Sequence, residues 1–134
     1  MDTRVESAST IVCDAVVVGA GPAGATAALA LAEAGPDVVL VGPEAAHDPR
    51  TTALLGGSVE HLARLGVWAD VEPEAAPLVV MRLVDDTGRL VRAPEVTFES
   101  YELGLDAFGW NVPNDALNAA LAAAVARSPR LRRL

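Results

Sequence analysis

The stretch that decides the fold of this chain is CDAVVVGAGPAG, at residues 13–24. It begins as a run of β-branched residues and passes directly into the spacing Gly19-x-Gly21-x-x-Gly24, after which an alanine- and leucine-rich helix is predicted. In this pattern Gly19 permits a tight turn off the strand, Gly21 lets a pyrophosphate lie against the backbone, and Gly24 lets the helix pack closely on the sheet. The stretch therefore predicts a dinucleotide-binding βαβ unit.

The residues on either side of the glycines complete that unit. Residues 11–18 are almost continuously apolar, as in a parallel strand that is covered on both faces. The helix is predicted at 22–34, and a second parallel strand follows at 37–41. Pro22 and Ala23 lie in the first helical turn, where backbone N–H groups and the positive end of the helix dipole face a phosphate. They join the three glycines as expected cofactor-binding residues.

The rest of the chain predicts a mixture of helices and short strands. A loop is expected at 42–52, a helix from 57 or 58 to 65, and a hairpin of strands 78–84 and 89–92 around a turn at 85–88. A further strand is expected at 96–99. The last helix is expected at 114–126, with Asn114 as its N-cap.

Composition excludes several classes of protein. The chain has 134 residues, 51% of them hydrophobic, which suits one folded domain and argues against disorder. Its formal net charge of −8 disfavours nucleic acid as a partner. No apolar run is long enough for a membrane span, and residues 1–10 do not resemble a secretory signal. A single cysteine indicates a reducing compartment, so the cytoplasm is expected.

Few other side chains predict chemistry. His47, His61 and Cys13 do not have the spacing of metal ligands, so no metal site is expected. Cys13 is expected to be buried in the first strand, and Trp68 and Trp110 to pack in the core rather than against a substrate. Four of the ten arginines lie in the last eight residues and are expected to be solvated charge after a helix end. No catalytic residue is predicted.

Three blocks of sequence carry a resemblance to a known family. The first is the strand and glycine pattern of 14–24. The second is DPRTTAL at 48–54, leading into SVEHLARLGVW at 58–68, and the third is FGWNVPN at 108–114 with the apolar helix positions after it. With these blocks the chain resembles the FAD-dependent aromatic hydroxylases (flavoprotein monooxygenases), and within them the ubiquinone-biosynthesis hydroxylase group.

The resemblance implies an α/β fold: the N-terminal βαβ of a Rossmann-like FAD-binding domain plus a β-hairpin from an incomplete substrate domain. It divides the chain into part of the FAD-binding domain at 1–76, partial substrate-domain strands at 77–107, and a return segment with a helix at 108–134. It implies FAD as cofactor, NAD(P)H as electron donor, and O₂ and an aromatic or quinone-precursor molecule as reactants. Arg50 matches the family's arginine near the flavin phosphates, a role that its planar fork suits.

The chain departs from the family's pattern at two places. The acidic residue expected at the end of the second strand, where it would accept hydrogen bonds from the ribose, is Gly42 here. Glu44, two residues further on, is the candidate to replace it. The family's later cofactor segments are absent, and a third parallel strand would only begin where this sequence stops. We therefore expect a truncated N-terminal piece, inactive alone, with unpaired strand edges and a missing C-terminal half or other biosynthetic subunits as partner.

Two other readings of the sequence stay open. One is a different dinucleotide-binding oxidoreductase, either an NAD(P)-dependent dehydrogenase or an amine-oxidising flavoenzyme. The other is a non-catalytic remnant that is stable only beside a missing second half. A lipid-tailed quinone substrate would also allow a peripheral position at the inner face of the cytoplasmic membrane, although no segment of the sequence indicates it.

Overall fold

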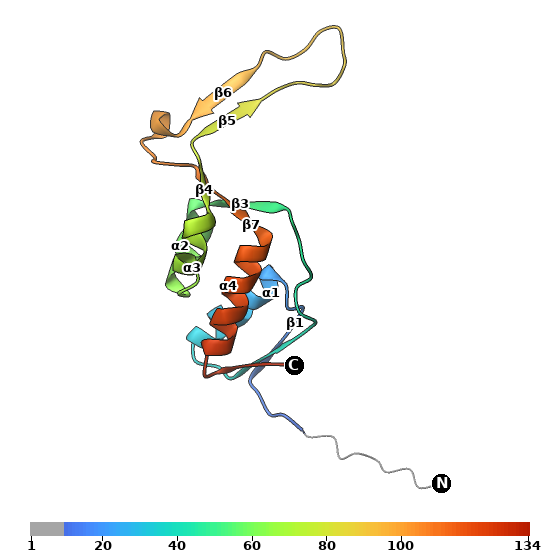
Figure 1. Cartoon of the computed structure of the whole chain (residues 1–134), viewed down its shortest axis with the longest axis vertical. Coiled ribbons are helices and arrows are strands. Elements are labelled where there is room, and N and C mark those ends of the chain that lie inside the picture. Colours follow the sequence, from blue (N-terminus) through green and yellow to red (C-terminus); the bar gives the residue numbers. More distant parts are fainter. Residues whose placement is uncertain (1–9) are drawn as a thin grey trace, which may run out of the picture.

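A computed structural model describes residues 10–134, and its elements are labelled in Figure 1. Residues 1–9, which carry most of the polar N-terminal segment discussed above, lie outside the described residues. The strands form three small sheets, and helices cover the first two of them. The α/β class predicted from the sequence is confirmed.

The first sheet is parallel and has the order β1-β2-β8. Its strands are β1 (Ala15–Val18), β2 (Val38–Val41) and β8 (Leu131–Arg133), and α1 (Pro22–Glu33) connects the first two. The expectation that the third parallel strand is missing is wrong, because β8 pairs with β2 over three residues. Leu131 is buried, whereas the arginines beside it made this segment look like a solvated tail.

The first strand is shorter and more open than its sequence suggests. It begins at Ala15 rather than at residue 11, and Cys13 is half-buried in the segment before it instead of buried in the strand. The strand alternates between half-buried and exposed positions, with Val16 57% and Val18 81% exposed. The expectation of cover on both faces is therefore wrong, because Val16 and Val18 share one face of the strand and that face is left open by residues 10–134.

The second sheet is antiparallel, with the order β3-β7-β4, and the sequence predicted neither β3 nor β7 as a strand. Its strands are β3 (Thr51–Leu55), β7 (Gly109–Pro113) and β4 (Ala76–Leu78). Three short helical segments connect β3 to β4, and they are α2 (Gly56–Arg64), α3 (Trp68–Val71) and the 3₁₀ turn η1 (Glu72–Glu74). The sequence predicts a loop that includes residues 51 and 52, but in the structure all five residues of β3 pair with β7. A Cβ at Gly109 would lie 2.2 Å from the Leu54 carbonyl oxygen, so the close pairing requires glycine there.

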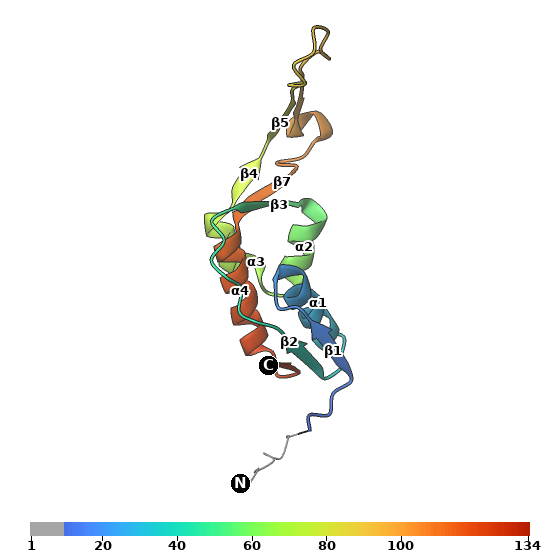
Figure 2. The same ribbon diagram turned by 90° about the vertical axis from the view of Figure 1, so that its right-hand side faces the viewer.

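The third sheet is a two-stranded hairpin of β5 (Val80–Leu83) and β6 (Val96–Glu99), followed by the 3₁₀ turn η2 (Ser100–Leu103). The strand expected at 96–99 is confirmed, but the return strand expected at 89–92 is wrong, because that segment belongs to the connection. The Asp85 carboxylate accepts hydrogen bonds from the backbone N–H groups of Thr87 (3.1 Å) and Ala93 (3.0 Å), which hold the connection as a wide loop. The hairpin projects from the body of the molecule (Figures 1 and 2).

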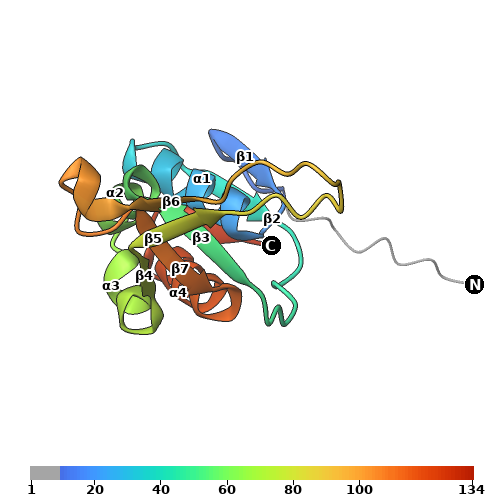
Figure 3. The same cartoon turned by 90° about the horizontal axis from the view of Figure 1, so that it is seen from above.

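The core lies between the parallel sheet and two helices. In addition to α1, α4 (Asn114–Arg127) buries one face, and the two helices contact each other. Alanines at the buried positions of both helices let them approach closely. Trp68 and Trp110 meet edge to face with ring centroids 5.7 Å apart at the junction with the second sheet, as expected for packing residues. In the view from above, the projecting hairpin lies in front of this body (Figure 3).

Candidate functional site

The glycine-rich turn has the close contacts that its sequence requires. Gly19 has φ +106°, and its N–H donates to the Val41 carbonyl at 2.8 Å, which joins the turn to the end of β2. A Cβ at Gly24 would lie 1.7 Å from the Gly19 carbonyl oxygen, so no other residue fits there. At Gly21, by contrast, a Cβ would meet nothing, and this residue stands directly before the first turn of α1. The turn thus leaves open backbone at the N-terminus of α1.

The end of β2 lies against the same turn. A Cβ at Gly42 would be 2.7 Å from the Ala20 backbone nitrogen, so a side chain of any kind is excluded at this position. This explains why the chain has no acidic residue there. The Glu44 side chain is 90% exposed and lies 3.8 Å from Arg133 of β8. Whether Glu44 receives a ribose stays a prediction.

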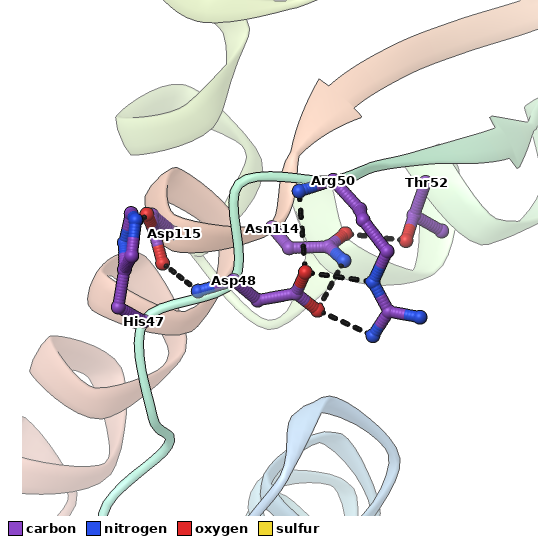
Figure 4. A network of polar contacts seen from close by, with 6 residues as sticks. All are labelled: His47, Asp48, Arg50, Thr52, Asn114 and Asp115. Carbon is purple, nitrogen blue, oxygen red and sulfur yellow. Dashed lines mark hydrogen bonds and ion pairs between the residues drawn. The ribbon is translucent and has the colours of Figure 1, made fainter.

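Arg50 lies just before β3 and is held by Asp48, as Figure 4 shows. The guanidinium donates through Nε to Oδ1 and through Nη2 to Oδ2 of the carboxylate, both at 2.7 Å. The Arg50 N–H donates to the same Oδ1 at 3.2 Å. This is a two-point pairing of a planar fork with a carboxylate, the geometry in which such pairs are strongest.

Asp48 is in turn fixed to α4, which starts 66 residues later in the sequence. Its Oδ2 accepts a hydrogen bond from Asn114 Nδ2 at 2.8 Å, and its N–H donates to Asp115 Oδ1 at 2.8 Å. Thr52 donates to Asn114 Oδ1 at 2.5 Å, and His47 Nδ1 lies 2.6 Å from Asp115 Oδ2. Figure 4 shows all six side chains of this network.

The network corrects one prediction and explains two pKa shifts. Asn114 is the first residue of α4 rather than its N-cap, because its side chain contacts Asp48 and Thr52 instead of the helix backbone. Hydrogen bonds from Arg50 and then Asn114 hold the pKa of Asp48 well below its usual range. The hydrogen bond between the Asp48 and Arg50 side chains raises the pKa of Arg50. Both groups are therefore charged at every physiological pH.

An open pocket of about 720 Å³ adjoins this network. Its walls come from the first turns of α1, the start of β3, α2 and the N-terminal half of α4. Of the predicted site residues, Pro22, Ala23 and Arg50 line it together, and Gly19, Gly21, Gly24 and Glu44 do not. Its other walls are mostly small or apolar, and they include Ala27, Leu54, Leu62 and Leu117.

Sequence reasoning missed Asp48, Thr52 and Asn114 as members of this site. All three belong to the blocks that carried the family resemblance, but nothing in a linear reading indicates that they meet. Among residues 10–134, no group of three or more histidine, cysteine or carboxylate side chains could hold a metal ion. No helix in the same range is both long and apolar enough to span a bilayer.

Comparison with known proteins gives one family and several solved structures. A family model described as "FAD binding domain" matches residues 12–127. The p-nitrophenol 4-monooxygenase PnpA from Pseudomonas putida is similar in structure, with a TM-score of 0.67 and 21% identity over 90% of this chain and 31% of its own. The flavin-dependent monooxygenase PieE, solved in complex with FAD and substrate, has a TM-score of 0.66 and 29% identity over 94% of this chain and 24% of its own.

A third similar structure is 2-methyl-3-hydroxypyridine-5-carboxylic acid oxygenase, with a TM-score of 0.64 and 24% identity over 90% of this chain and 30% of its own. No curated protein matches the chain. The chain thus spans only about a quarter to a third of the length of these three solved proteins.

Proposed function

Since this chain belongs to the FAD-binding domain family, whose model matches residues 12–127, we propose that it is the N-terminal FAD-binding part of a flavin-dependent monooxygenase acting on an aromatic ring. The observation that carries the proposal is the meeting of three features. The glycine-rich turn leaves open backbone at Gly21, the pocket begins at the next residues of α1, and Arg50 lines the pocket from the opposite wall.

The residues present fit FAD. The pyrophosphate would lie along Gly19, Gly21 and Gly24, where the absence of side chains and the helix dipole favour it. Pro22 and Ala23 would border it, and Arg50 would hold phosphate oxygens with its unengaged N–H groups. Glu44 would accept hydrogen bonds from the ribose, since Gly42 offers no side chain.

The chain's own contribution to the reaction would be binding and orientation. FAD, when bound, would supply the redox and oxygen-transfer chemistry, with NAD(P)H as electron donor and O₂ as the second substrate. The apolar residues with which α1, β3 and α4 line the pocket would limit the access of water to the bound cofactor. No side chain in the described residues needs to act as a base in this scheme.

The finer parts of the proposal rest on the family resemblance. We assign residues 1–76 and 108–134 to the FAD-binding domain and residues 77–107 to strands of a substrate domain. The substrate class would be a quinone precursor, as in ubiquinone biosynthesis, in the cytoplasm or at the inner face of the cytoplasmic membrane. The solved neighbours support the broader proposal because three of them are named monooxygenases or oxygenases, one of them in complex with FAD.

The test is a pair of titrations on the full-length protein as its gene encodes it. FAD and NADH are added separately, and binding is followed by flavin fluorescence and by calorimetry. We expect FAD to bind at micromolar concentration or tighter. Tight NADH binding without FAD binding would favour a nicotinamide-dependent dehydrogenase and reject the proposal. The Gly21→Ala variant is the matched probe, because a Cβ there meets no protein atom within 4 Å and would intrude only on a ligand.

A further inference from the structure

Arg50 uses only one side of its guanidinium in the protein. Asp48 takes Nε and Nη2, and among residues 10–134 no other side chain forms a hydrogen bond or ion pair with the Arg50 guanidinium. Nη1 and the second hydrogen of Nη2 are therefore left on the far edge of the fork. Figure 4 shows this edge pointing away from the carboxylate. An arginine has five N–H donors in a fixed plane, so fixing one edge also fixes the direction of the other.

The two partners are held very differently. The Arg50 side chain is 81% exposed and has little packing to restrict its rotamers. Asp48 is only 22% exposed, and three further contacts fix it: its N–H to Asp115, its Oδ2 to Asn114 and its Oδ1 to the Arg50 backbone. The direction of the guanidinium is thus determined by a carboxylate that is itself attached to α4.

We propose that Asp48 is a positioning residue, which holds the free edge of the Arg50 guanidinium toward the pocket for a phosphoryl group of FAD. The proposal deepens the function argued above and rests on it. The phosphoryl group is the ligand chemistry that matches a planar pair of N–H donors beside a helix N-terminus.

The carboxylate has a second, opposing effect that makes the proposal testable. It neutralises Arg50, and a negative charge near a phosphate weakens binding. Removing Asp48 would therefore tighten FAD binding if charge were the dominant effect, and weaken it if orientation were. Four hydrogen bonds to Asp48 oxygens, including the backbone one, favour orientation.

The experiment is a double-mutant cycle on the full-length protein, with FAD affinity as the readout. Asp48→Ala should weaken FAD binding roughly 2- to 12-fold, the effect of immobilising one flexible side chain only on binding. Arg50→Ala should weaken it by about 10-fold or more. In the Arg50→Ala background, Asp48→Ala should not weaken FAD binding further, because no guanidinium is left to orient and only the repulsion between the carboxylate and the phosphate is removed.

A matched control separates positioning from loss of charge or fold. Asp37→Ala removes a carboxylate that also faces an arginine, Arg130, at 3.4 Å but lies away from the pocket. It should leave FAD affinity unchanged. Thermal melts of the FAD-free variants show whether each one is folded, and the NMR signal of Arg50 Nε–H should lose its protection from exchange in Asp48→Ala.

The outcomes are distinguishable. Failure of the unmutated protein to bind FAD overturns the proposed function, and this inference falls with it. Normal FAD binding together with equal weakening by Asp48→Ala in both backgrounds overturns the positioning role alone. Tighter binding by Asp48→Ala overturns it as well, because charge would then dominate over orientation.

Discussion

The body of the molecule and the β5–β6 hairpin are built from similarly apolar sequence but differ in what covers it. The buried hydrophobic residues among 10–134 all lie in the body, on the parallel sheet, the helices, the turn before α3 and β7. In the hairpin, every large apolar side chain of the two strands is at least two-fifths exposed, including Met81 and Phe98. Only Ser100, at the end of β6, is buried there. The hairpin thus has backbone pairing without a core, and a two-stranded hairpin in that condition is marginally stable.

The largest expected effect is on the glycine-rich turn of the body. Gly24→Ala places a Cβ 1.7 Å from a backbone oxygen, which cannot move without distorting the end of β1. We expect at least about 3 kcal/mol of destabilisation, the upper part of the range for overpacking, and loss of FAD binding. Urea unfolding of the full-length protein measures it.

Its counterpart in the hairpin is Gly88→Ala. Gly88 has φ +71°, so alanine there costs about 1 kcal/mol of local strain, but its Cβ would meet nothing. The urea midpoint of the body should therefore change little. A loss of the full amount, about 1 kcal/mol, from the unfolding free energy of the body would show that hairpin and body unfold as one unit.

The second comparison truncates one apolar side chain in each region. Leu121 of α4 is 1% exposed, and Leu121→Ala should cost about 2–5 kcal/mol in free energy of unfolding. Phe98 of β6 is 43% exposed, and Phe98→Ala should cost less than about 1 kcal/mol. Chemical unfolding followed by circular dichroism gives both values. Equal losses would mean that another part of the full-length protein covers β6.

The smallest expected effects are on the pKa values of two aspartates, Asp48 in the body and Asp85 in the hairpin. The pKa values of Asp48 and Asp85 are both lowered, the first mainly by the Arg50 side chain and the second mainly by the backbone N–H of Ala93. Above the unfolded pKa of about 3.9, the ionised carboxylate keeps its hydrogen bonds and stabilises its region fully. This stabilisation is lost only as the pH falls through the lower pKa of the folded state. Carbon-13 NMR of the carboxyl groups should show both aspartates titrating at a lower pH than an ordinary aspartate.

The Arg50→Ala variant tests the cause. It should move the pKa of Asp48 upward toward its usual value and leave that of Asp85 unchanged, since Arg50 is not among the groups that act on Asp85. An unchanged Asp48 titration in this variant would mean that the Asn114 side chain and the backbone N–H of residue 50 are enough to hold the carboxylate ionised.

The sequence predicts the helices and strands that are determined by residues close together in the chain. The strand, turn and helix from residue 15 to 33 follow from consecutive residues, and so do α2 and α4. The strands β3, β7 and β8 were missed because each is three to five residues long and is defined by a partner distant in sequence. The hairpin was predicted, but the Asp85 contact with Ala93 shifted its second strand seven residues along the chain.

The residues of the candidate site also fall into two groups, those that a short sequence motif identifies and those that only the folded structure brings together. The glycines and Arg50 could be named from short motifs, because their residue types carry the chemistry. Asp48 and Asn114 could not, since each matters only through the other and 66 residues separate them. At Gly42 the sequence shows that the expected acidic residue is absent, but it does not show why. The structure gives the reason, because a Cβ at this position would collide with the Ala20 backbone nitrogen.

The position of β8 has a consequence for how the protein is made. β2 is the middle strand of its sheet, yet the strand that completes it begins about ninety residues later in the chain. At ribosomal speeds of about 5–20 residues per second, the far edge of β2 waits roughly 5–20 seconds for its partner. During that interval an apolar strand edge is open to other nascent chains. Synthesis rate and chaperone supply should therefore influence the yield of this protein more than its small size suggests.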